Sequence, residues 1–233
     1  MTLFTTQIRP ARLTLRVLSH VLRYPDSVFR EHAEEMRQAM QAEAVLSPQR
    51  LVEMEALLTH LELQPALTAE SDYVELFDRG RSTALHLFEH VHGDSRDRGP
   101  AMVDLIQTYE KAGVFLNPQE LPDYLPVLLE FASTQPGPLA REFLGEIAHI
   151  VRVIFSALLA RHSPYASALA AVLEIAGEKV DAVALAPEPS VDESWAEPEV
   201  FGGCSTAGQA KPGQPQPIQF VKQRPSQSLG AEP

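Results

Sequence analysis

Apolar side chains recur every three or four residues through almost the whole chain before residue 187. This spacing places them on one face of an α-helix, and that face must be buried against other helices. No run of strand length alternates apolar and polar residues, and no Asn-Gly or Asp-Gly pair indicates a hairpin. The pattern therefore predicts an all-α fold, a single-domain bundle of eight or nine helices over residues 1–186.

The apolar stripe of each predicted helix also gives the residues expected in the core. In chain order these are Leu13, Val17, Val21, Phe29, Ala33, Met36, Met40, Leu51, Met54, Leu58, Leu61, Tyr73, Phe77, Leu85, Phe88, Val91, Met102, Leu105, Ile106, Tyr109, Phe143, Ile147, Ile150 or Val151, Ile154, Leu158, Leu169, Val172, Leu173 and Ala176.

Short polar residues and glycines predict where several helices begin and end. Asp26 or Ser27 is expected to cap one helix and Ser47 the next, because their side chains accept bonds from free N–H groups of the first turn. Gly80 is expected to end a helix in the left-handed conformation that glycine adopts without strain. Ser82 is then expected to cap the following helix.

Composition changes sharply at Pro187. The last 47 residues hold eight prolines and five glycines, and apolar residues there are sparse and without a period. Such a segment cannot bury enough apolar surface to offset its ordering entropy, so residues 187–233 are expected to be mostly disordered. Within 191–201, Val191, Trp195 and Phe201 lie among acidic residues. This short motif is expected either to dock on its own core or to bind a partner.

The charge balance limits the classes of partner and compartment. The formal charge of −12 and the lack of Lys or Arg runs argue against nucleic acid as a partner and favour cationic protein segments.

Cys204 is the single cysteine, so no internal disulfide is possible. The first 22 residues lack the apolar core of a signal peptide, and the most apolar stretch, 147–160, is too short to span a bilayer. A soluble cytoplasmic protein without stable membrane insertion is expected.

The sharpest catalytic pattern is His86-Leu87-Phe88-Glu89-His90, which matches the H-x-x-E-H motif of some zinc peptidases. On a helix, His86 and His90 face the same side and can hold zinc, with Glu89 as the general base. Against this interpretation, the motif normally lies in domains that contain strands, and no third ligand stands out. No other nucleophile, phosphate-binding or dinucleotide-binding motif is present. The sequence therefore predicts a protein that is not an enzyme and holds no metal.

Charged and aromatic residues alternate closely through 73–81 and 87–99. Two interpretations remain open from the residues alone. In the first, the Arg and Asp side chains form a network that only orders two loops. In the second, the same network is a recognition surface.

The segment YVELFDRGRSTALHLFEHVHGDSRDRGPAMVDLIQTYEKAG (73–113), followed by LNPQELPDYLPVLLEFAS (116–133), closely resembles the NarJ family of nitrate reductase assembly chaperones. The resemblance covers roughly residues 11–201. The wider family includes the TorD and DmsD chaperones, whose Y-x-x-L-F pattern falls on Tyr73, Leu76 and Phe77. Their E-x-x-D-H loop falls on Glu120 and Asp123, but its final histidine is replaced by Tyr124.

The resemblance implies an all-helical chaperone with no catalytic residue and no cofactor of its own. Such a protein binds the apo form of the molybdenum-containing catalytic subunit of respiratory nitrate reductase. It keeps that subunit competent for cofactor insertion and delays its docking to the membrane. Recognition is expected to involve the N-terminal segment of the subunit. The alternatives are a general helical adaptor or the H-x-x-E-H zinc peptidase.

The family motifs and the polar-aromatic stretches together give the expected site for the partner peptide. Its residues are Tyr73, Leu76, Phe77, Asp78, Arg79, Phe88, Glu89, His90, His92, Glu120, Pro122, Asp123 and Tyr124. The loop of Glu120–Tyr124 is expected to supply acidic residues at the rim.

Overall fold

The computed structural model describes residues 9–93 and 95–185, and within them it has nine α-helices and no β-strand. The helices are α1 (Arg12–Val21), α2 (Ser27–Glu43), α3 (Pro48–Leu63), α4 (Ala66–Tyr73), α5 (Leu87–Val91), α6 (Arg98–Lys111), α7 (Leu125–Thr134), α8 (Gly137–Ala160) and α9 (Ala166–Ala176). A π-helical turn, η1 (Val74–Asp78), and a 3-10 turn, η2 (Arg81–Thr83), lie between α4 and α5. The predicted all-α fold is confirmed. The predicted tail with its Trp195 motif lies outside the described residues.

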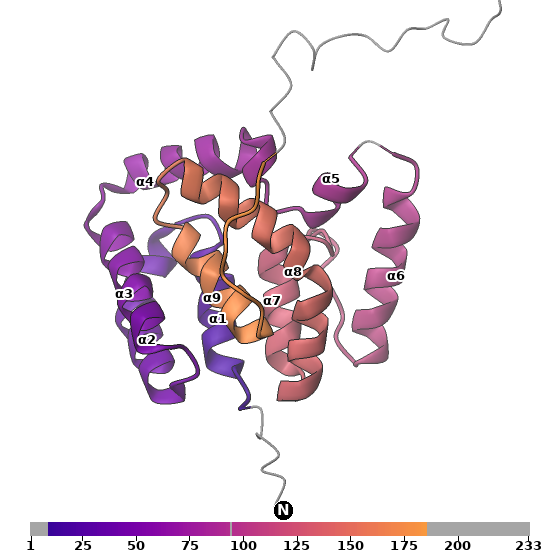
Figure 1. Cartoon of the computed structure of the whole chain (residues 1–233), viewed down its shortest axis with the longest axis horizontal. Coiled ribbons are helices and arrows are strands. Elements are labelled where there is room, and N and C mark those ends of the chain that lie inside the picture. Colours follow the sequence, from indigo (N-terminus) through magenta and orange to yellow (C-terminus); the bar gives the residue numbers. More distant parts are fainter. Residues whose placement is uncertain (1–8, 94, 186–233) are drawn as a thin grey trace, which may run out of the picture. The chain divides into compact units, whose positions relative to one another are not determined.

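The core is built around α9, which lies between α3 and α8 in Figure 1 and also contacts α1. Eight of its eleven residues are buried, and five of these are alanines that allow close approach of the neighbouring helices. α8 packs along α9 and against α7, while α7 also packs on α1. The buried side chains of these four helices form one continuous cluster with those of α2 and α3.

α8 is the one helix in the described ranges that is long and apolar enough to cross a membrane. It is longer than the apolar stretch identified in the sequence, because it begins at Gly137. Half of its most apolar window is buried inside the protein. Burial of Leu144, Val151 and Leu158 in the core accounts for that hydropathy without a membrane.

Two of the predicted helix caps are confirmed. The Asp26 carboxylate accepts a hydrogen bond of 3.1 Å from the Phe29 N–H at the start of α2. The Ser47 hydroxyl accepts one of 3.3 Å from the Arg50 N–H, ahead of proline at the first position of α3. Phe29, Met36 and the other predicted core residues of α2 are all buried.

The predictions for Gly80 and Ser82 are wrong. Gly80 has a φ of −84°, so it is not a left-handed helix terminus. Glycine is needed there for space, because a Cβ atom would meet the Thr83 hydroxyl and the Leu76 carbonyl oxygen. No helix follows Ser82 directly, since η2 covers 81–83 and α5 begins only after His86.

Several predicted core residues are exposed. Leu13 is 44% exposed and Val91 is 53% exposed. In α6 only Tyr109 is buried, while Met102, Leu105 and Ile106 are half-buried. α6 stands at the edge of the bundle, beyond α7 and α8 in Figure 1, so its apolar face is only partly covered.

The N-terminus of α1 is capped by a side chain from another helix. Ala11, which precedes α1, provides no side-chain cap. The Glu43 carboxylate at the end of α2 instead accepts bonds from the Leu13 N–H at 2.9 Å and from the Thr14 N–H at 2.7 Å. It also accepts a bond from the Thr14 hydroxyl at 2.7 Å. A negative charge at this end also interacts favourably with the helix dipole.

We predict that Glu43→Ala lowers the free energy of unfolding by about 1–2 kcal/mol, the usual cost of losing an N-terminal cap. Chemical denaturation monitored by circular dichroism measures this difference. The matched control is Glu31→Ala, which removes an exposed glutamate from the same helix. An equal loss in both variants would contradict the capping role of Glu43.

Candidate functional site

Five aromatic side chains gather where α1 ends and α4 passes into η1. We call them the tyrosine cluster: Tyr24, Tyr73, Phe77, Tyr124 and Tyr165. The Tyr73 ring lies 4.8 Å from Phe77 and 5.7 Å from Tyr24, and Phe77 lies 5.0 Å from Tyr165, measured between ring centroids. Edge-to-face and tilted contacts at these distances are favourable for aromatic pairs.

Hydrogen bonds fix the tyrosine cluster to the end of α1. The Tyr73 hydroxyl donates to the Leu22 carbonyl oxygen at 2.8 Å and lies 3.1 Å from the Tyr124 hydroxyl. Burial raises the pKa of both Tyr73 and Tyr165 above the ordinary tyrosine value. Both phenols therefore stay protonated at neutral pH and can donate hydrogen bonds, but they supply no charge.

The segment between Tyr73 and Gly80 forms a π-helical turn, a conformation that is rare and is frequent at functional sites. It exposes Asp78 and Arg79 while Phe77 stays buried. The Arg79 guanidinium pairs with the Glu75 carboxylate at 2.9 Å on the outer side of the turn. The turn therefore places the exposed charges of Asp78 and Arg79 next to the buried ring of Phe77.

Asp123 is the centre of a second group, the Asp123 cluster, which also contains His86, Phe88 and Arg98. Its carboxylate is 0% exposed and accepts a bond of 3.1 Å from the Phe88 N–H at the start of α5. His86 Nδ1 lies 3.5 Å from Oδ1 and an Arg98 nitrogen lies 3.7 Å from Oδ2. His86 Nδ1 and Asp123 Oδ1 are buried and have no hydrogen-bond partner, although they face each other at this distance.

Backbone contacts hold the Asp123 cluster to the tyrosine cluster. The Leu87 N–H donates to the Asp123 carbonyl oxygen at 3.0 Å, and the Leu125 N–H donates to the Leu85 carbonyl oxygen at 2.8 Å. The His86 and Tyr124 rings stack with centroids 5.0 Å apart. The loop before α5 and the loop before α7 therefore form one unit, although 38 positions separate His86 from Tyr124.

The placement of Asp123 corrects the expectation of an acidic rim. A fully buried carboxylate that caps a helix does not steer a partner from the surface. Glu120 is the acid of this loop that is partly accessible, and it pairs with Arg23 at 3.2 Å. Pro122 is also buried, and its carbonyl oxygen accepts a bond from the Tyr109 hydroxyl at 2.7 Å.

The geometry of H-x-x-E-H differs from that of a zinc site. His86 has an extended backbone and precedes α5, so the helical spacing assumed for His86 and His90 is wrong. His90 Nε2 lies 2.8 Å from the Ala84 carbonyl oxygen instead. Glu89 is exposed and pairs with Arg98 at 3.3 Å. Across residues 9–93 and 95–185, no three His, Cys, Asp or Glu side chains are grouped as metal ligands.

The remaining predicted residues lie in these same surroundings. Leu76 is half-buried beside Tyr165. His92 meets the half-buried Phe88 ring edge-on at 5.5 Å. The thirteen predicted residues thus fall into two connected groups. Their buried members pack beneath the surface, and the thirteen residues do not line one common groove.

Two hollows flank α4 and η1, and both have acidic residues in their walls. One, of about 320 Å³, is lined by Leu76 and Tyr165, by the acids Asp72 and Glu75, and also by Arg161, His60 and His162. The other, of about 270 Å³, is lined by Tyr24, Leu67 and Val74, by the acids Glu70 and Glu75, and by Arg79, which pairs with Glu75. Leu67 is 81% exposed there. We call these two sites the acidic hollows.

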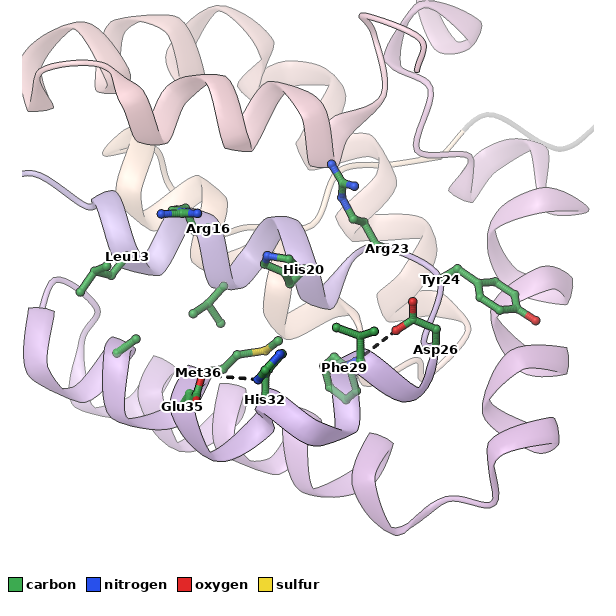
Figure 2. Close-up of a pocket in the computed structure, with 13 residues that line it drawn as sticks. Leu13, Arg16, His20, Arg23, Tyr24, Asp26, Phe29, His32, Glu35 and Met36 are labelled. Carbon is green, nitrogen blue, oxygen red and sulfur yellow. Dashed lines mark hydrogen bonds and ion pairs between the residues drawn. The ribbon is translucent and has the colours of Figure 1, made fainter. Parts of the chain in front are cut away.

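A third hollow, the α1–α2 groove, was missed by the sequence analysis. Its volume is about 400 Å³, and Figure 2 shows its walls formed by α1 and α2. Its apolar side chains are Leu13, Val17, Val28, Phe29, Met36 and Ala39. Its polar ones are Arg16, His20, Arg23, Tyr24, Asp26, His32 and Glu35. The exposed faces of two amphipathic helices were the available signal, but the sequence does not say that these two faces meet.

Charges in the α1–α2 groove are mostly compensated by neighbours. Arg23 pairs with Glu120 and with Glu130, and His32 lies 3.4 Å from Glu35. Burial, followed by the charge of Arg23, lowers the pKa of His20, which is therefore neutral at pH 7. In the described ranges, no ion pair is formed by Arg16.

Comparison with known families gives a match over residues 44–171 to the family described as nitrate reductase delta subunit. The chain is 41% identical over 182 residues to the nitrate reductase molybdenum cofactor assembly chaperone NarJ of Escherichia coli K12. That alignment covers 78% of this chain and 77% of the relative. The probable assembly chaperone NarJ of Bacillus subtilis is 32% identical, over 70% of this chain and 87% of its own length.

Among solved structures, a putative redox enzyme maturation protein from Archaeoglobus fulgidus matches with a TM-score of 0.50. The match covers 72% of this chain and 94% of that protein at 19% identity. At this level of identity the likeness concerns the fold alone. It agrees with the all-helical architecture described above.

We predict that Asp123→Ala lowers the free energy of unfolding by about 1–3 kcal/mol, because the partly buried Phe88 N–H loses its acceptor and Arg98 loses one of its two carboxylate neighbours. Thermal or urea unfolding measures the loss. Glu89→Ala is the control, since it removes the other, exposed partner of Arg98 and is expected to change stability by at most about 1 kcal/mol. Unchanged stability in Asp123→Ala would show that the two loops are held together by other contacts.

Proposed function

The chain belongs to the nitrate reductase delta subunit family, and from this membership we propose that it is a molybdenum cofactor assembly chaperone for a respiratory nitrate reductase. It binds the apo form of the catalytic subunit and holds it competent for cofactor insertion. It also delays docking of that subunit to the membrane until the cofactor is in place. The 41% identity to an assembly chaperone over most of both chains is the observation that carries this proposal.

The function is one of binding and not of catalysis, as in the chaperone family to which the chain belongs. The protein works in the cytoplasm, where the apo subunit is made and loaded. Its excess of 12 negative charges disfavours nucleic acid and favours a cationic protein segment.

We place the N-terminal segment of the catalytic subunit at the acidic hollows. Glu70 and Asp72 supply negative charge there, Glu75 shares its charge with Arg79, and Leu67, Leu76 and Tyr24 supply apolar contact. An amphipathic segment laid between helices gains affinity from apolar burial, and its positive charges gain from the acidic walls.

The residues predicted from the sequence divide between two roles in this proposal. Leu76 and Arg79 line the acidic hollows, and Asp78, Glu89 and Glu120 are accessible outside them. Tyr73, Phe77, Pro122 and Asp123 are buried and keep the surface in shape. A substitution at one of these buried residues therefore changes the stability of the fold first, and a change in binding can follow from that loss alone.

A deletion strain tests the proposed function directly. Without this chain, the nitrate reductase of the source organism is expected to lose most of its molybdenum, and expression of the intact chain is expected to restore it. Elemental analysis of the purified reductase measures the metal. A fully loaded but mislocated reductase would favour the general adaptor, and a fully loaded and normally located one would overturn both functions.

We predict that Leu67→Ser weakens binding of a peptide with the first residues of the catalytic subunit about fivefold to tenfold. Leu67 is 81% exposed in the free protein, and its replacement by serine removes the apolar contact with the peptide.

The double variant Glu70→Gln with Glu75→Gln is expected to flatten the salt dependence of peptide binding, since salt screens only the charged contribution to the affinity. Calorimetric titration at low and high salt measures both effects.

The control for that titration is Val52→Ser, which removes an apolar side chain that is 66% exposed on α3. It is expected to leave the peptide affinity unchanged. If all three variants bind the peptide as the natural chain does, the acidic hollows are not the binding site.

A further inference from the structure

The chain that follows α9 turns back over the bundle as an irregular segment, residues 177–185, which we call the strap (Figure 1). It contains no helix or strand, and all of its residues are exposed. Its large apolar side chains, Val180, Val183 and Leu185, keep 36–38% of their surface open to solvent. Apolar packing therefore holds the strap only in part, and its attachment depends on polar contacts as well.

Arg152 of α8 makes three polar contacts with the strap. Its guanidinium donates to the Glu178 carboxylate at 3.0 Å and to the Lys179 carbonyl oxygen at 3.2 Å. It also pairs with the Asp181 carboxylate at 3.4 Å. The side chain of Arg152 is 22% exposed, so it lies largely beneath the segment that it binds. One arginine thus receives two carboxylates that stand three positions apart in the strap.

Ser156 makes a fourth polar contact, one helical turn further along α8. Its hydroxyl accepts a bond of 2.9 Å from the Val183 N–H and donates one of 2.7 Å to the Arg152 carbonyl oxygen. Because Arg152 and Ser156 are four positions apart in one helix, they lie on the same face. Together they offer a cation for carboxylates and an acceptor for a backbone N–H. We call these two residues the α8 peptide site.

The strap fits the α8 peptide site imperfectly. Arg152 Nε is buried and has no hydrogen-bond partner, although Asp181 Oδ1 lies 3.4 Å from it. A buried donor without an acceptor costs free energy. The Glu178 and Asp181 side chains are 42% and 64% exposed, so their ion pairs with Arg152 contribute little to stability. A carboxylate that bound Nε and Nη together would satisfy the guanidinium better than the strap does.

We propose that the strap is an autoinhibitory occupant of the α8 peptide site and that an acidic segment of a partner protein displaces it. The partner segment carries two carboxylates three positions apart, followed by an apolar residue, as the strap does at Glu178, Asp181 and Val183. One carboxylate binds both Nε and Nη of Arg152, and a backbone N–H binds the Ser156 hydroxyl. Segments with few buried apolar contacts open at low cost in free energy, so this exchange leaves the helices in place.

This site is separate from the acidic hollows. Neither Arg152 nor Ser156 lines them, and the hollows attract cations whereas Arg152 attracts carboxylates. The inference therefore does not depend on which segment the acidic hollows bind, or on the identity of the catalytic subunit.

A synthetic peptide of residues 177–185, GEKVDAVAL, is the probe for the α8 peptide site. The full chain is labelled with ¹⁵N and titrated with the peptide to millimolar concentration, and NMR shifts of the Ser156 amide report binding. In the natural chain the strap competes with the peptide. The released variant, Glu178→Gln with Asp181→Asn, removes both carboxylates of the strap and is expected to bind the peptide about fivefold more tightly.

Hydrogen exchange gives a second readout of the same displacement. The Val183 N–H is held by Ser156 in the natural chain, so it is expected to exchange about fivefold faster in the released variant. Saturating peptide is expected to accelerate this exchange in the natural chain too, because the peptide takes the place of the strap.

Two further variants serve as controls. Arg152→Gln, added to the released variant, is expected to remove the gain in peptide affinity. Asp104→Asn with Glu110→Gln makes the same charge change at two exposed acids of α6, and it is expected to leave both the peptide affinity and the exchange of Val183 unchanged. Circular dichroism of each variant confirms that the helices are intact.

Four outcomes would overturn the proposal. Equal affinity in the natural chain and the released variant would mean that the strap does not compete for the site. Affinity that survives Arg152→Gln would place the peptide on another surface. Absence of binding at millimolar peptide would make the strap a purely structural part of the fold. Exchange of Val183 that changes with protein concentration would mean that the site exchanges straps with a second copy.

Discussion

Enclosure of α9 is the constraint on which the rest of the bundle depends. This helix is mostly apolar and eight of its eleven residues are buried, so it is stable only when other helices surround it. α3, α8 and α1 pack on different sides of it, and its alanines let their backbones come close. α7 is then held by α1 and α8, and α2 by α1 and α3. A large-to-small change at a residue such as Leu169 or Leu173 would leave a cavity at the centre of this packing.

The proposed binding surface is formed by loops that polar contacts hold to this bundle. Asp123 holds the start of α5, and the Tyr73 hydroxyl holds the end of α1. Each of these bonds joins segments that are far apart in the chain and would not stay together through local propensity. The contacts bear out one of the two interpretations left open by the sequence, because much of the network orders loops. The other, a recognition surface made by the charges that remain exposed, stays a prediction. A chaperone needs such a surface to be ordered before its partner arrives, because a preorganised site costs less entropy to bind.

Charge is distributed unevenly over the protein, and this separates its surfaces by chemistry. The acidic hollows lie beside α4 and η1, whereas Arg12 and Arg16, which form no ion pair within residues 9–93 and 95–185, lie on α1. A cationic peptide is attracted to the first region, while an acidic one is attracted to the second.

The sequence by itself determined the helical fold and the caps at Asp26 and Ser47, because these signals act between residues three or four positions apart. The family motifs also identified the residues around which the loops are built. The tertiary structure alone decided that Asp123 is a buried cap 35 positions from its partner, that Gly80 avoids a steric clash, and that His86 lies outside the helix. It alone decided that α1 and α2 enclose a groove. These features depend on which faces meet in space, and an amphipathic pattern specifies that a face is buried without specifying what it is buried against.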